Sequence, residues 1–210
     1  YSYIYNQKDI LKCLNIDNQK NNFGDAMLIL LLYLKYGEKL FKYLNGDFSF
    51  VIYNKKTNKI FLARDHVGIK PLYYYKDDNR LIFASEVKCI FEMFSIDRSV
   101  NYEWIDSFLL RLDPQADSNY FKNIKKMEPG CYACVDYEGI HINKYWNIDS
   151  IKPTVYKNSS DYIEHFRELL IRSIDYRLSE HYQNGCELSG GLDSSGITCI
   201  ASDILKSRGK

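Results

Sequence analysis

The hydrophobic pattern of the chain changes near Ser160, and this change limits the possible folds more than any other feature of the sequence. Before residue 146, short segments in which apolar and other residues alternate come in pairs across polar turns, as at residues 46–53 and 59–63. Alternation with period two is typical of strands with one buried face, and such pairs predict antiparallel hairpins. From Ser160 to Leu178 the apolar residues instead fall at helical spacing. We therefore expect an α+β region followed by the start of an α/β region.

Turn residues and helix signals divide both regions further. Asp25 is a typical N-cap and Gly37 a typical end of the helix between them. Polar residues and Pro153 make residues 147–160 a linker, so the expected domains are 1–146 and 161–210. The other expected elements are helices at 9–14, 38–44, 85–94, 102–110 and 195–207, hairpins at 72–84 and 131–145, and strands at 1–6 and 185–188.

Composition argues against several classes of partner. The chain has 28 Lys and Arg against 27 Asp and Glu, and its formal net charge is +1. This balance gives no global attraction to nucleic acid or to an anionic membrane. No apolar run reaches the roughly 18 residues of a membrane span, and the six Cys are not spaced as a secreted disulfide framework. We expect a reduced, cytoplasmic protein that binds neither nucleic acid nor membrane.

The motif that carries most chemical information follows the expected strand at 185–188. It consists of Leu188, Ser189, Gly190, Gly191, Asp193, Ser194 and Ser195. Glycines let the backbone approach an anion, and the N-terminus of the following helix favours negative charge there. Serine hydroxyls add donors, and Asp193 suits the Mg²⁺ that a polyphosphate also binds. No Lys follows the glycines, so the loop resembles the pyrophosphate loop of enzymes that transfer AMP from ATP to a carboxylate.

The candidate sites also have plain structural interpretations. The glycine loop can be a turn before a Ser/Asp helix cap, and Asp25 can be only a cap. Cys131 and Cys134 are spaced like half a zinc site, but no second pair follows, and positions i and i+3 of a strand face opposite ways. Residues 64–66 (Arg, Asp and His) are interpreted as a structural turn with a buried polar network. His141 is expected to be a surface residue.

Five segments carry a resemblance to a known family. They are residues 45–50, 63–74, 83–88, 127–130 and 144–146. Together they resemble the glutaminase half of the glutamine-hydrolysing asparagine synthetases, and the glycine loop falls where that family has its pyrophosphate loop. The resemblance implies an N-terminal-nucleophile amidohydrolase domain, a four-layer αββα sandwich, before the first elements of a parallel-sheet ATP-pyrophosphatase domain.

The resemblance also implies a reaction and its ligands. It implies a ligase that forms an amide bond through an acyl-adenylate, most directly asparagine from aspartate and glutamine. The implied partners are glutamine, aspartate or another carboxylate, and a homodimer is possible. The implied cofactors are ATP and Mg²⁺. Carried over by position, Asp25 binds glutamine, the loop residues named above bind ATP, and Asp193 holds the metal ion.

Departures from the family pattern leave alternatives open. The family's nucleophilic Cys is absent, so no catalytic residue is assigned. Tyr1-Ser2-Tyr3 replaces an Asn-Gly-Glu whose Asn and Gly help to form the oxyanion hole. Met27 stands where the family usually has Glu. An inactive glutaminase domain, as in β-lactam synthetases and lasso-peptide cyclases, is the alternative, and a non-catalytic protein with the same fold is a third. Because the chain starts inside an expected strand and stops soon after the loop, we expect an inactive fragment.

Overall fold

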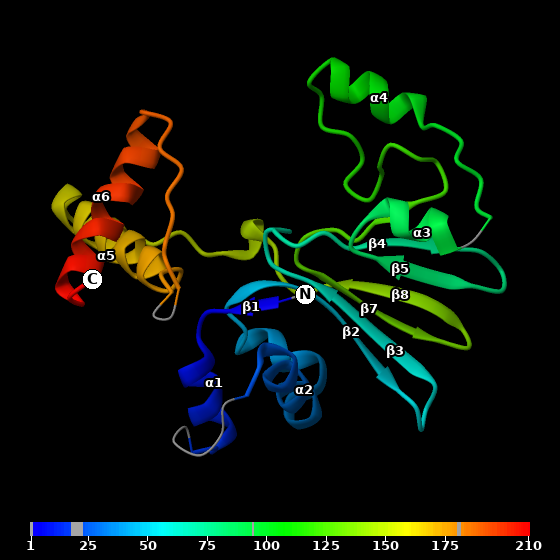
Figure 1. Cartoon of the computed structure of the whole chain (residues 1–210), viewed down its shortest axis with the longest axis horizontal. Helices are drawn as coiled ribbons and strands as arrows, with labels where there is room; N and C mark the ends of the chain where they lie inside the picture. The colour runs from blue at the N-terminus through cyan, green and yellow to red at the C-terminus, as the bar shows by residue number, and fades with distance from the viewer. Residues whose placement is uncertain (1, 18–22, 94, 180–181) are drawn as a thin grey trace. The chain divides into compact units, whose positions relative to one another are not determined.

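The structure is a computed structural model that describes residues 2–17, 23–93, 95–179 and 182–210. The chain forms two compact units, Tyr1–Ile151 and Lys152–Lys210 (Figure 1). Within the described ranges, no helix combines the length and the apolar character that crossing a membrane requires.

The first unit contains two antiparallel sheets. The larger has the strand order β1-β2-β3-β7-β8 and the smaller the order β5-β4-β6. The expected hairpins are confirmed, with Val51 paired to Leu62 and Tyr74 paired to Phe83. The short strand β6 was not expected from the sequence. The strands are β1 (Ser2–Ile4), β2 (Gly46–Asn54), β3 (Lys59–Arg64), β4 (Tyr73–Lys76), β5 (Leu81–Ala84), β6 (Lys125–Lys126), β7 (Cys131–Asp136) and β8 (Gly139–Lys144).

The helices of the first unit match most of the predicted ones. Predictions at 9–14, 25–36 and 102–110 are confirmed, whereas the segment predicted as a helix at 38–44 is a 3₁₀-helix. Short connectors of this kind often take the tighter 3₁₀ form. Position 94, the predicted end of the helix at 85–94, lies outside the described residues. The helices are α1 (Gln7–Leu14), α2 (Asp25–Tyr36), η1 (Gly37–Lys42), α3 (Val87–Met93), α4 (Tyr102–Leu109) and η2 (Ile148–Ser150).

Alternation along the strands divides the first unit into layers. On β3, Phe61 and Ala63 belong to a helix-side cluster under α1 and α2, whereas Leu62 between them belongs to an inter-sheet cluster. On β5, Ile82 packs instead with Ile90 of α3 in a third cluster. Figure 1 shows α1 and α2 on one side of the larger sheet and α3 beside β4 and β5. The order helix, sheet, sheet, helix confirms the four-layer αββα expectation for this unit.

A buried polar turn ends β3. The Arg64 guanidinium donates to the carbonyl oxygens of Lys70, Met127 and Gly68 at 2.7, 2.7 and 2.5 Å. The Asp65 carboxylate accepts two backbone N–H groups from the next loop, at 2.9 and 2.8 Å. Gly68 has φ +73°, and a Cβ there would lie 2.9 Å from the guanidinium, so only glycine fits. The structural interpretation of residues 64–66 is therefore confirmed.

The second unit contains α5 (Ser159–Asp175) and α6 (Leu192–Ser207), which pack on each other (Figure 1). The predicted strand at 185–188 is wrong, since these residues belong to no strand. A strand is stabilised by hydrogen bonds to a neighbouring strand, and the described part of this unit offers none. α6 begins at Leu192 rather than at Ser195, so the end of the glycine loop forms its first turn.

Candidate functional site

The glycine loop lies at the N-terminus of α6. Gly190 has φ +83°, a backbone conformation that other residues rarely adopt, while an added Cβ would meet no atom within 4 Å. The backbone conformation, rather than crowding, therefore explains the glycine. The hydroxyl oxygens of Ser189 and Ser194 lie 3.0 Å apart, and the Ser194 hydroxyl also donates to the Gly191 carbonyl at 3.2 Å. These contacts close the loop across the two glycines.

The first turn of α6 offers donors to an anion. Its N-cap is Gly191, and no side chain of the described residues caps it. The first N–H groups of a helix have no intrahelical partner and carry its positive end. Asp193 stands in the same turn and is exposed. The donors fit a pyrophosphate group, and the carboxylate fits an ion bound to that group.

Asp25 is the first residue of α2, but it does not cap the helix. The N-cap is Gly24, without a side-chain hydrogen bond. The Asp25 carboxylate instead accepts the Ile4 N–H of β1 at 3.1 Å and the Gln7 side-chain amide of α1 at 2.7 Å. The prediction of a cap is therefore wrong, because the side chain turns away from its own helix to join three elements.

Gln7 is a residue that the sequence does not single out. Its Nε2 donates to Asp25 Oδ1, one of the two oxygens that the family resemblance assigns to the glutamine substrate. The contact depends on how α1 and α2 pack, so no pattern within a single segment of the sequence predicts it. Gln7 is exposed and Asp25 half-buried, which leaves the amide free to move.

His66 packs among aromatic rings beside the buried turn. Its ring centroid lies 6.2 Å from that of Phe48, 5.2 Å from that of Tyr145 and 5.8 Å from that of Trp146. Burial lowers the pKa of His66, and the charge of Asp65 opposes this only in part. A neutral imidazole packed among rings agrees with a structural role.

The two cysteines of β7 face opposite sides of the larger sheet. Cys131 lies in the inter-sheet cluster, whereas Cys134 packs against the helix-side cluster and donates from Sγ to the Glu38 carboxylate at 3.5 Å. Burial, together with Glu38, raises the pKa of Cys134 to about 11. The two side chains thus face opposite ways, as predicted for positions i and i+3 of a strand.

Comparison with known proteins identifies the family. A model of the glutamine amidotransferase domain matches residues 2–146, and a model of asparagine synthase matches residues 165–209. The chain is 32% identical over 210 residues to asparagine synthetase [glutamine-hydrolyzing] 3 of Bacillus subtilis, covering 99% of this chain and 34% of that protein. It is 30% identical over 188 residues to amidase chry2 of Gibberella zeae, covering 87% of this chain and 27% of that protein.

The chain thus spans about a quarter to a third of the length of these curated relatives. A solved structure, that of the allosteric regulatory enzyme of purine biosynthesis, is similar with a TM-score of 0.46 and 18% identity, over 69% of this chain and 27% of that one. The first family model alone covers most of the sequence. The chain therefore belongs to the family of the glutamine-hydrolysing asparagine synthetases, with a glutamine amidotransferase domain as its larger part.

Proposed function

We propose that the chain is part of a ligase that forms an amide bond through an acyl-adenylate, with ATP as the driving substrate. The most direct reaction converts aspartate, glutamine and ATP into asparagine, glutamate, AMP and pyrophosphate. The observation that carries this proposal is the glycine loop, whose left-handed Gly190 and uncapped helix N-terminus suit a pyrophosphate group. The two family matches, in the order amidotransferase then synthase, support it.

The proposed roles follow from the chemistry of each group. The backbone at Gly190 and Gly191, with Leu188 before it, lines the phosphates, and the hydroxyls of Ser189, Ser194 and Ser195 donate to them. Asp193 would repel a phosphate by itself, so its role is to hold Mg²⁺, which neutralises charge on the leaving pyrophosphate. In the first unit, Asp25 would bind the amino group of glutamine.

A second candidate function keeps the ATP chemistry without glutamine hydrolysis. Two observations favour it: the Gln7 amide already occupies Asp25 Oδ1, and Ser2 stands where the family has the Gly that helps to form the oxyanion hole. Tyr1 lies outside the described residues. In this case the amine would come from the substrate itself, as in β-lactam synthetases and lasso-peptide cyclases.

Pyrophosphate release by the full-length protein tests the first proposal. With ATP, Mg²⁺, aspartate and glutamine, we expect release that Asp193→Ala abolishes. The matched control is Asp203→Ala, which removes an exposed carboxylate from the same helix and is expected to leave the rate unchanged. An unchanged rate in Asp193→Ala would contradict the role of Asp193, and no release with any carboxylate would contradict the ligase proposal.

The nitrogen source separates the two candidates. Turnover with glutamine at a rate similar to that with ammonia would support the first and exclude the second. Turnover with ammonia or a substrate amine alone would support the second. For the whole protein we also propose a homodimer, with domains 1–146 and 161–210 joined by the linker 147–160; the subunit number is measurable by light scattering.

A further inference from the structure

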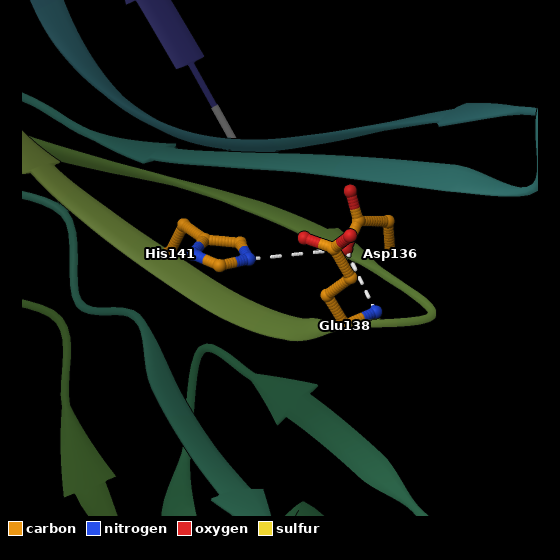
Figure 2. A group of neighbouring side chains, drawn as sticks. All are labelled: Asp136, Glu138 and His141. Carbon is orange, nitrogen blue, oxygen red and sulfur yellow. Dashed lines mark hydrogen bonds and ion pairs between the residues drawn. The ribbon is translucent and has the colours of Figure 1, made fainter.

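The hairpin of β7 and β8 gathers three side chains with metal-binding atoms at one end of the larger sheet. Asp136 ends β7, Glu138 lies in the turn, and His141 is on β8 (Figure 2). One carboxylate oxygen of each acid and one ring nitrogen of the histidine all lie within 4.8 Å of one another. None of these residues belongs to the proposed ATP or glutamine sites.

Strand register explains why these three residues converge. Asp136 pairs with Gly139, and Cys134 pairs with His141, so Asp136 and His141 are diagonal neighbours on one face of the hairpin. The Glu138 N–H donates to Asp136 Oδ1 at 3.0 Å, which holds the Asp136 carboxylate in place (Figure 2). The local fold therefore fixes the Asp136 carboxylate, and the exposed Glu138 and His141 side chains lie beside it.

The spacing suits a shared ion better than a direct contact. His141 Nε2 and Asp136 Oδ1 are 3.8 Å apart, too far for a hydrogen bond. Metal–ligand bonds of about 2.0–2.2 Å place two donors of one ion about 3–4 Å apart. The imidazole and the carboxylate thus stand at the separation of two ligands on one ion.

The local charge also favours a cation. Asp136 and Glu138 bring two carboxylates, and Lys59, 3.3 Å from Asp136 Oδ2, compensates one of them. His141 is neutral when it acts as a ligand, so the set keeps a net negative charge that attracts a cation. Two carboxylates and one imidazole are a donor set for Zn²⁺, Mn²⁺ or Fe²⁺.

We propose that Asp136, Glu138 and His141 form a binding site for a divalent first-row transition-metal ion. Three protein ligands leave coordination positions open to water, because Glu138 and His141 are exposed. The site lies on the first unit and is independent of the Mg²⁺ assigned to Asp193.

Manganese binding by the purified chain, measured by electron paramagnetic resonance without nucleotide, tests the proposal. Mn²⁺ prefers oxygen and nitrogen donors, so the six free cysteines do not compete for it. We expect Glu138→Gln and His141→Gln each to weaken binding at least about tenfold. Tryptophan fluorescence should show unchanged folding, since both side chains are exposed.

Three further variants sharpen the test. Lys59→Gln should tighten Mn²⁺ binding, because it frees Asp136 Oδ2, whereas a purely structural ion pair would give no such gain. Glu164→Gln, an exposed acid on α5, and Asp193→Asn should both bind Mn²⁺ like the unmodified chain. Equal affinity in His141→Gln and the unmodified chain would overturn the proposal, and so would loss of binding in Asp193→Asn.

Discussion

The two units of the chain use similar amphipathic patterns with opposite results. The first unit buries its apolar residues in three clusters, whereas in the described part of the second only Ile174 and Ala201 are buried. Phe166 of α5 is 66% exposed and Leu192 of α6 is 93% exposed. The pattern therefore tells which face of an element is apolar, but burial requires that a covering layer be present. Substitutions in both units can test this contrast, and their expected effects decrease from the core of the first unit to the surface of α5.

Truncation of a core ring should affect the first unit most. Phe48 is fully buried in the helix-side cluster, and we expect Phe48→Ala to lower the free energy of unfolding by about 4 kcal/mol, from lost transfer energy and a residual cavity. Urea unfolding followed by tryptophan fluorescence reports this unit alone, because Trp104 and Trp146 both belong to it. A loss below about 1 kcal/mol would mean that the ring packs loosely.

Disruption of the buried turn at residues 64–66 should cause the second largest loss of stability. Arg64→Met removes the donor to three carbonyl oxygens, and we expect a loss of about 3 kcal/mol because the buried Met127 carbonyl and the part-buried Gly68 and Lys70 carbonyls lose this charged donor. Arg172→Met, on α5, is the matched control and should change the fluorescence transition by less than about 0.5 kcal/mol. Similar losses in both variants would break the contrast between the units.

The Asp25 carboxylate should contribute less to the stability of the first unit than Phe48 or Arg64 does. Asp25→Asn keeps one acceptor but turns the other oxygen into a donor that faces the Ile4 N–H or the Gln7 amide. We expect a loss of about 1 kcal/mol in the same urea experiment. Gln7→Ala, which leaves the Ile4 contact, should lose less than Asp25→Asn does. The reverse order would mean that Gln7, and not the carboxylate, joins α1 to α2.

Acid should weaken the first unit through His66. Burial lowers its pKa in the folded state from the ordinary 6.5, so the unfolded chain binds the proton first. The contribution is thus fully present above about pH 6.5 and is lost as pH falls below it toward the lower folded pKa. His66→Gln should flatten this part of the stability profile between pH 7 and 5. An unchanged slope in the variant would assign the acid sensitivity to other groups.

The smallest effect is expected in the second unit. Phe166→Ser replaces a ring that is mostly in solvent, so the thermal transition followed by circular dichroism should change by less than about 0.5 kcal/mol. In the full-length protein, a larger loss of stability in Phe166→Ser would indicate that further layers cover α5. A large effect in the isolated chain would show that the ring is buried in solution.

The sequence predicted those features that depend on local pattern. Alternation located the hairpins of β2 with β3 and of β7 with β8, and the residue types at 64–66 indicated a buried polar turn. The prediction of a strand at 185–188 was wrong because periodicity cannot tell whether a neighbouring strand is present to pair with it. The contact of Gln7 with Asp25 and the approach of His141 to Asp136 were missed, since both join residues through packing or register that no single segment contains.

The contacts of Gly130 fix the last residues of the amidotransferase match to the core of the first unit. Its carbonyl accepts the N–H groups of both Tyr145 and Trp146, at 2.8 and 3.2 Å, and the Tyr145 hydroxyl donates to the Arg64 carbonyl at 2.8 Å. A side chain at position 130 would come within 2.6 Å of the Trp146 carbonyl oxygen. The chain therefore leaves the amidotransferase domain from a clamped point. The glycine thus attaches the chain to the core of the first unit as far as Trp146, and any larger residue at position 130 would have to displace this segment.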